Sequence, residues 1–349
     1  MNNDTTVTIG CDVGDRRTFI CEILPDGELR RCSIRTTRAA MRAHFERPPA
    51  HVVLEVGSHS RWIAALLAEL GHRVSVANPR ELQLITRSSN KTDENDAEKL
   101  ARLGRADVTL LRPIQHRGAD AQADLAVAKA RDALVATRTK LVNHVRGTVK
   151  SLGERLPKCN ADSFARTTRD MIPAVLKPAL APIYATLDAL DEQIKEHDRT
   201  LKSLAEKYTD VDVVSQIDCV GLITAIVFVL TIGDKTRFTE SRMVGAYLGL
   251  RPGKSQSGSS DPQMRITKCG DPFARRLLVN CANYILGPFG KDCDLRRWGQ
   301  TLCKRGGSNA RKRAKVAVAR KLAVLMHRLS ITGEVYEPLR NASTDNLAA

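Results

Sequence analysis

The first 77 residues alternate between strand-like and helix-like segments, and this order restricts the fold more than any other feature of the chain. Apolar residues alternate with polar ones along the first segment, at Val7, Ile9, Cys11 and Val13. The same period of two returns over residues 17–24 and 28–34, with the turn residues Pro25, Asp26 and Gly27 between them. We therefore expect three strands that form an antiparallel meander.

The following segments continue the alternation. Helices are expected over residues 37–45 and 60–70, with Gly71 ending the second. Strands are expected over 51–56 and 73–77, because both segments are short and rich in valine. Strands alternating with helices after a meander predict a mixed α/β sheet.

Four acidic residues of this region form a candidate metal site. Asp12 and Glu55 lie near the ends of two expected strands, and Asp93 and Asp96 share one face if residues 93–103 are helical. In a ribonuclease-H-like sheet the first and fourth strands are neighbours, so a following helix can bring all four carboxylates to one end. Carboxylates together with water and phosphate oxygens are the ligands Mg²⁺ prefers, and paired ions support phosphodiester chemistry.

Each of these acids also has a simpler interpretation. Asp12 and Glu55 precede glycines closely and are typical of a solvated strand face or a turn. Asp93 and Asp96 are typical of the first turn of a helix, where acidic side chains meet the positive end of the helix dipole. The constellation of all four, rather than any single acid, favours the metal site.

Residues 115–208 have a different periodicity. From Ala119 to Leu152 the chain contains no proline, and apolar residues recur at spacings of seven and four. After a break over residues 157–182, apolar residues continue to Leu204 at spacings of four, three, four, seven and three, with a polar slot between Ile194 and Leu201 that interrupts the seam. This alternation predicts an antiparallel helical hairpin with a coiled-coil seam, which either stays within one chain or pairs with another copy.

Positive charge is concentrated near the C-terminus. The chain carries a formal net charge of +16, and residues 251–330 hold 18 Lys and Arg against 4 Asp and Glu, a net +14. A polyanion explains this concentration better than a solvated basic face, and nucleic acid is the commonest polyanion partner. An anionic membrane surface is disfavoured, because no amphipathic anchor with aromatic residues is present.

Other features exclude a secreted or membrane protein. No apolar run approaches the roughly 18 residues of a membrane span, and the N-terminus has no basic segment followed by an apolar one. The nine cysteines include no CxxC pair, which indicates reduced, mostly buried thiols in a cytosolic protein. We expect the cytoplasm of a bacterium and no membrane partner.

The motifs taken together resemble a known family. The order Asp-Val-Gly at residues 12–14, Leu-Glu-Val-Gly at 54–57 and Asn-Lys-Thr-Asp-x-x-Asp-Ala at 90–97 is similar to that of the DEDD transposases, the insertion-sequence recombinases of the IS110 family. Their N-terminal domain resembles the RuvC resolvase. The resemblance implies that Asp12, Glu55, Asp93 and Asp96 are an acidic tetrad that binds Mg²⁺. Residues 56–59 depart from the family pattern of a small residue, Thr, Gly, any residue and Tyr.

The C-terminal motifs carry the same resemblance. A Gly- and Ser-rich stretch at 253–260 is by composition a flexible loop, but the pattern from Gly249 to Leu277 is similar to the family's C-terminal transposase domain. That match places Ser257, before Gly258, on the nucleophilic serine. Basic residues around it are expected to favour its alkoxide and to hold DNA phosphates: Lys254, Arg265, Lys268, Arg275 and Arg276. The turn at 217–221 is similar to the family's helix-hairpin-helix turn, although Asp218 and Cys219 replace its usual Pro and Gly, which favours a structural role.

The resemblance also implies an activity, partners and a domain order. We expect DNA cleavage by Ser257, a transient 5′-phosphoserine link, and a tetrad supplied by a different protomer of a dimer or tetramer. Expected partners are donor and target double-stranded DNA and a non-coding bridge RNA. A related DNA invertase, a RuvC-like nuclease and a non-catalytic DNA-binding protein remain alternatives. The expected domains are a RuvC-like domain at 1–114, a coiled-coil linker at 115–208, a mainly helical transposase domain at 209–335 and a tail at 336–349. A basic helix is expected over residues 304–329.

Overall fold

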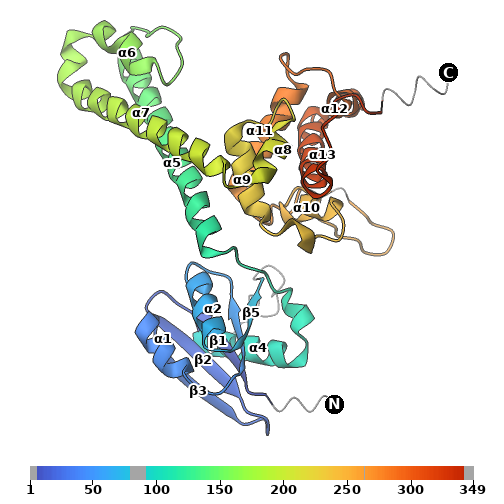
Figure 1. Ribbon diagram of the computed structural model, residues 1–349. Helices are drawn as coiled ribbons and strands as arrows, with labels where there is room; N and C mark the ends of the chain where they lie inside the picture. Colours follow the sequence, from blue (N-terminus) through green and yellow to red (C-terminus); the bar gives the residue numbers. More distant parts are fainter. Residues whose placement is uncertain (1–5, 79–91, 263, 342–349) are drawn as a thin grey trace, which may run out of the picture. The chain divides into compact units, whose positions relative to one another are not determined.

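A computed structural model describes residues 6–78, 92–262 and 264–341 (Figure 1). The chain divides into two compact units, Met1–His116 and Arg117–Ala349, each of which is described by itself. Asn90 and Lys91 of the third acidic motif, and the end of the expected tail, lie outside the described residues.

The N-terminal unit contains a five-stranded mixed sheet. Its strands are β1 (Thr8–Val13), β2 (Arg17–Ile23), β3 (Leu29–Arg35), β4 (His51–Glu55) and β5 (Arg73–Ala77). They lie in the order β3-β2-β1-β4-β5. The first three are antiparallel, as the meander predicted, whereas β4 and β5 run parallel to β1. The prediction of a mixed α/β sheet is therefore confirmed.

Helices cover both faces of this sheet. The apolar faces of α1 (Arg38–Phe45) and α2 (Ser60–Glu69) share a core with Ile9, Cys11 and Leu54. Helix α4 (Asp93–Ala106) lies on the opposite face, where its Leu100 packs with Val53. A short 3-10 helix, η1 (Val108–Leu111), follows α4. Among the described residues, α4 thus covers the face that carries residues 10 and 53, together with Leu111 of η1.

A long helical hairpin begins the C-terminal unit. Helices α5 (Ala119–Ser151) and α7 (Lys177–Ala205) run antiparallel, as shown by the ion pairs Arg131–Asp198 and Arg138–Asp191. Between them lie α6 (Phe164–Thr168), η2 (Arg169–Met171) and η3 (Ala174–Leu176). The expected hairpin is present; its pairing with another copy stays a prediction. The break lies earlier than expected, since α5 ends at Ser151 and α7 begins at Lys177. Proline is tolerated in the first turn of α7, and Pro182 lies inside the helix.

The remaining helices pack around one core together with the base of the hairpin. They are α8 (Thr209–Ser215), α9 (Leu222–Ile232), η4 (Lys235–Arg237), α10 (Arg242–Tyr247), α11 (Pro272–Leu286), α12 (Asp294–Lys304) and α13 (Ala310–Thr332). Leu125, Ala128, Leu201 and Leu204 of the hairpin belong to the same core as α9, α11 and α13. The structure thus joins the hairpin and the helices after residue 209 in one compact unit.

Two expectations from the sequence are wrong in detail. The basic helix was expected to begin at residue 304, but α12 ends at Lys304 and the basic helix α13 begins only at Ala310. Gly306 and Gly307 between them adopt φ values of 79° and 86°, which end a helix and reverse the chain. All nine cysteines are free, but only Cys11, Cys21 and Cys281 are buried. Across the described helices, none has the length and apolarity needed to cross a bilayer.

Candidate active site

Asp12 and Glu55 end two neighbouring strands. Strands β1 and β4 are paired in parallel up to Cys11 and Leu54, so Asp12 and Glu55 are the next residues along each strand. Because side chains alternate along a strand, Asp12 shares a face with Gly10, and Glu55 shares it with Val53. That is the face covered by α4, and both carboxylates are half-buried there.

Helix α4 lies unusually close to β1 at Gly10. A Cβ atom built on Gly10 would lie 2.0 Å from the carbonyl oxygen of Ala97 and 2.5 Å from the nitrogen of Ala101. A Cβ on Gly104 would lie 2.4 Å from Val53 Cγ2, so a second glycine brings the helix close to β4. The two glycines therefore set the position of α4 on the sheet.

The direction of α4 brings Asp96 toward the strand ends. Ala97 and Ala101 lie over Gly10, whereas Gly104 lies over Val53 and near His51, toward the beginning of the strands. Arg105 donates to the carbonyl of Leu24, which also lies at that far end of the sheet. The first turn of α4 therefore points to the carboxyl ends of β1 and β4, where Asp12 and Glu55 lie.

The first turn of α4 carries the other two predicted acids. Thr92 caps the helix by accepting a hydrogen bond from the Asn95 N–H at 3.2 Å. Asp96 is 8% exposed, and its Oδ1 lies 3.0 Å from Lys99 Nζ, whereas Asp93 is exposed. Asp93 and Asp96 lie in the first turn of α4, as expected for acids that meet the helix dipole. The same turn lies toward the edge of the sheet, so the interpretation as metal ligands is also compatible with the structure.

The donor set suits Mg²⁺, although the side chains do not form a closed cage. Within the described ranges, no three His, Cys, Asp or Glu residues are arranged to hold a metal ion. Mg²⁺ commonly uses only one or two carboxylates and takes its other ligands from water and substrate phosphates. Asp12, Glu55 and Asp96 provide ligands of this type near one edge of the sheet, and Asp93 lies one turn earlier on α4.

A further group lies at the same edge and was not predicted from the sequence. Trp62 Nε1 donates to His59 Nδ1 at 3.0 Å, and His59 Nε2 lies 3.3 Å from Asp15 Oδ1. Because the indole is only a donor, His59 Nδ1 must be the acceptor, and Nε2 then carries the proton toward Asp15. His59 is one of residues 56–59, which depart from the family pattern, and this departure is the one sequence signal that could have found the group.

Ser257 lies near the tip of a hairpin that extends from Gly249 to Gly270. The two sides are joined by backbone hydrogen bonds from Lys268 to Gly249, from Thr267 to Arg251 and from Gly253 to Arg265, at 2.9–3.1 Å. At the tip, Ser257 and Ser260 exchange two backbone hydrogen bonds around Gly258, which has φ 55°. A positive φ at the first central residue is typical of a tight two-residue turn, so the Ser-Gly step sets the position of Ser257.

The base of this hairpin is closed by glycines and by Arg275. Cβ atoms on Gly249 and Gly270 would lie 2.1 Å from the carbonyl oxygens of Cys269 and Tyr247. Arg275 Nη1 donates to the carbonyls of Leu248 at 3.0 Å and of Cys269 at 2.9 Å, which belong to opposite sides of the hairpin. The hairpin is therefore fixed at its base, whereas Ser257 is exposed at its tip.

The five predicted nucleic-acid-binding residues separate into two groups. Lys254, Arg265 and Lys268 are exposed on the hairpin. Arg275 closes its base, and Arg276 pairs with Asp132 of α5 at 2.6 Å. In the part of the chain that the structure describes, we find no side chain hydrogen-bonded to the Ser257 hydroxyl.

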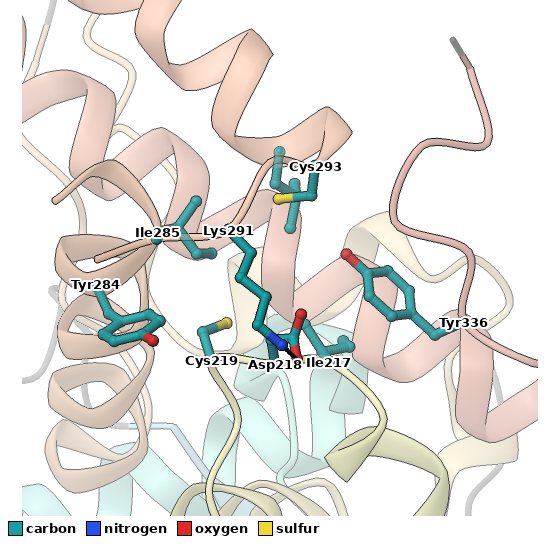
Figure 2. A pocket seen from close by; sticks show the side chains of 10 residues that line it. Ile217, Asp218, Cys219, Tyr284, Ile285, Lys291, Cys293 and Tyr336 are labelled. Carbon is teal, nitrogen blue, oxygen red and sulfur yellow. Dashed lines mark hydrogen bonds and ion pairs between the residues drawn. The ribbon is translucent and has the colours of Figure 1, made fainter. Parts of the chain in front are cut away.

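The turn between α8 and α9 carries internal contacts. Figure 2 shows Lys291 ion-paired with Asp218, at 2.8 Å, beside Cys219, Cys293 and Tyr336. The cavity that these residues line measures about 20 Å³, which is room for one water molecule rather than a base. A larger hollow of about 440 Å³ lies at the N-terminus of α9, but its Arg131 is already paired with Asp198. These contacts favour the structural role expected for this turn.

Comparisons with known proteins cover both units. Residues 9–153 match a transposase family model, the DEDD transposase of IS110, and residues 211–289 match the transposase IS116/IS110/IS902 family. The chain is 30% identical over 298 residues to the transposase of insertion sequence element IS1111A from Coxiella burnetii, covering 82% of this chain and 79% of that protein.

Two further relatives extend over similar lengths. The transposase of IS1328 from Yersinia enterocolitica is 30% identical over 298 residues, covering 83% of this chain and 86% of the relative. A probable family 20 transposase from Pseudomonas aeruginosa is 26% identical over 316 residues, covering 88% and 92%. The two family models together include both the sheet and the hairpin with Ser257.

Proposed function

Because the chain belongs to the IS110 family of transposases, and is thus an enzyme that cuts and rejoins DNA, we propose that Ser257 is its nucleophile and that Asp12, Glu55, Asp93 and Asp96 bind Mg²⁺. The observation that carries the proposal is the approach of α4 to β1 at Gly10, which directs the first turn of α4 to the edge where Asp12 and Glu55 end their strands. The sheet order supports a RuvC-like domain.

The proposed reaction is a transesterification at a DNA phosphate. The Ser257 oxygen forms a bond to phosphorus as the bond from phosphorus to the 3′ oxygen breaks. The serine proton passes to a base, the 3′ oxygen takes up a proton from an acid or from water and leaves as a hydroxyl group, and the 5′ phosphate stays on Ser257. The reverse step with another 3′ hydroxyl rejoins the strand without a free 5′ end. When bound, Mg²⁺ supplies charge stabilisation for the phosphate oxygens.

The residues of the hairpin have separate roles in this proposal. Lys254, Arg265 and Lys268 are exposed along it, so they hold phosphates on either side of the bond that is cut. Arg275 is instead a positioning residue, since its guanidinium joins the two sides of the hairpin at the base. Exposure of Ser257 suits a nucleophile that must reach a phosphate within a duplex.

The partners follow from family membership and from charge. We propose that the enzyme acts on donor and target double-stranded DNA with a bridge RNA that pairs with both, and that it works as a dimer or tetramer in which another protomer supplies the tetrad. The net charge of +14 over residues 251–330 supports polyanion binding. An invertase would share this chemistry and differ in its DNA sites.

The test is to trap and map the covalent intermediate. The full-length protein is incubated with DNA carrying element ends and the adjacent non-coding RNA, with Mg²⁺ or with EDTA. The adduct is digested, and the phosphopeptide is identified by mass spectrometry. We expect the modified residue to be Ser257, and Ser257→Ala to abolish the adduct, whereas Ser255→Ala and Ser259→Ala retain it. DNA cleavage by Ser257→Ala at the wild-type rate would indicate a RuvC-like nuclease and contradict the proposal.

A further inference from the structure

The stretch from residue 295 to residue 333 contains eleven Lys and Arg and no Asp or Glu. Several of these cations have clear internal roles. Arg296 donates to the carbonyls of Ile285 and Gly287, Arg297 pairs with Asp292, and Arg328 pairs with Glu334. Lys321 lies 4.5 Å from the centre of the Trp298 ring. The rest of the charge therefore needs another explanation.

Six of the remaining cations gather where α12 meets α13. We call this surface the basic corner: Lys304, Arg305, Arg311, Lys312, Arg313 and Lys315. Helices α12 and α13 pack antiparallel, because a Cβ on Gly299 would lie 2.6 Å from Val318 Cγ2. The turn through Gly306 and Gly307 consequently places the end of α12 beside the first turns of α13.

The basic corner is electrostatically unfavourable in the free protein. Cations at the N-terminus of a helix oppose its dipole, yet the first turn of α13 carries no acidic residue, and its N-cap, Asn309, makes no side-chain capping bond. Over the residues that the structure places, none of Lys304, Arg305, Arg311, Lys312 and Lys315 forms an ion pair. Neighbouring like charges and the helix dipole thus all favour an anion at this surface.

We propose that the basic corner binds the sugar-phosphate backbone of a nucleic-acid duplex. The partner must carry repeated negative charges, because the five cations without an ion pair among the described residues, at one helix end, exceed what a single carboxylate neutralises. Residues 304–315 contain no aromatic residue, which favours contacts to phosphates over contacts to bases. This concentration of charge is independent of Ser257 and of the tetrad.

The test measures binding as a function of salt. The full-length protein is titrated in EDTA against a labelled 30-base-pair DNA duplex and an RNA duplex of the same sequence, by fluorescence anisotropy at several KCl concentrations. The variant is Arg311→Gln, Lys312→Gln and Lys315→Gln together. Since each lost phosphate contact lowers the salt slope by about one, we expect the slope to fall by about two to three and the affinity by at least about tenfold.

A matched control separates this surface from general electrostatics. Lys140, Lys150 and Lys202 are exposed on α5 and α7, and their joint replacement by Gln removes the same charge. We expect this control to keep the wild-type slope. A lower salt slope in the corner variant with DNA, with RNA or with both supports the proposal that the basic corner binds a duplex, and it identifies which duplex. A wild-type slope in the corner variant, or an equal loss in the control, would overturn the proposal.

Thermal unfolding distinguishes a lost contact from a damaged fold. Removal of cations from the first turns of α13 should leave the melting temperature unchanged or raise it, because the dipole opposes them. If the triple variant melts earlier than wild type, the single variant Lys312→Gln decides, with an expected slope change of about one. Ser257→Ala should keep the full salt slope while losing the adduct, so the two proposals can fail independently.

Discussion

The acidic edge of the sheet and the serine hairpin hold their reactive groups in opposite ways. Asp12, Glu55 and Asp96 stand on paired strands and on a helix that contacts the sheet backbone at Gly10, and all three are at least half-buried. Ser257 is exposed at the tip of a hairpin whose firm contacts are at its base, around Gly249, Gly270 and Arg275.

The difference fits the roles proposed for the two groups. A metal site needs several carboxylates held in fixed positions, and a packed sheet edge provides them at the cost of accessibility. A nucleophile that attacks DNA must reach a phosphate that the protein cannot enclose. The sheet therefore supplies rigidity, and the hairpin supplies reach.

The largest effect on recombination is expected from substitutions in the acidic edge that leave the hairpin unchanged. Asp12→Asn or Asp93→Asn should reduce Mg²⁺-dependent recombination by more than about 100-fold, because even groups outside the first coordination shell cost 10–100-fold when removed. Recombination is measured over a Mg²⁺ titration. Glu28→Gln, an exposed acid at the start of β3, is the control and should behave as wild type. A tetrad variant with unchanged Mg²⁺ dependence would remove the metal site from the proposal.

The second prediction separates the position of α4 from the presence of the carboxylates at that edge. Gly10→Val forces α4 away from β1, and overpacking of this kind costs about 1–3 kcal/mol or more in the free energy of unfolding. Urea unfolding of the isolated variant measures the loss, and recombination should fall although every carboxylate is still present. Gly57→Ala is the control: its Cβ would have no atom within 4 Å, so stability should change by less than about 0.5 kcal/mol.

The third prediction loosens the hairpin while the sheet stays intact. Arg275→Met leaves the carbonyls of Leu248 and Cys269 without their charged donor, at a cost of about 1.5–3 kcal/mol. Limited proteolysis should cut residues 249–268 faster, and the yield of adduct should fall. Arg276→Met loses an exposed ion pair with Asp132 and should cost less than about 1 kcal/mol. Equal protease sensitivity in both variants would show that Arg275 does not fix the base.

The smallest expected effect concerns pH at the start of α11. Burial raises the pKa of Asp271, but hydrogen bonds from the Ala274 and Phe273 N–H groups and the Lys129 charge outweigh it, so the pKa is lowered overall. A lowered pKa stabilises the fold above the ordinary Asp value of about 4, and this contribution is lost as the pH falls through the folded-state pKa.

Two substitutions measure this contribution. Asp271→Asn keeps a capping side chain, so it should be slightly less stable than wild type at pH 7 and equal to it in strong acid. Asp271→Ala also loses the cap, which costs about 1 kcal/mol more. Urea unfolding from pH 7 to pH 2 records both. A constant difference between wild type and Asp271→Asn across this range would exclude a lowered pKa.

The local patterns determined much of the molecule from sequence alone. Period two in residues 7–35 specified the meander, and the spacings of seven, four and three specified the antiparallel hairpin of α5 and α7. Asp93 and Asp96 marked the start of α4, because the helix dipole acts within one turn. Composition alone predicted a flexible loop at 253–260, whereas the structure places these residues in a hydrogen-bonded hairpin.

Tertiary structure decided what lies beside what. No spacing in the sequence shows that α4 packs against Gly10, that Arg275 joins two sides of a hairpin, or that His59 lies between Trp62 and Asp15. Tertiary structure also decided that the basic residues from Lys304 onward lie where α12 ends and α13 begins. Local periodicity records which face of an element is apolar, whereas these contacts depend on how distant segments pack, which only the folded chain specifies.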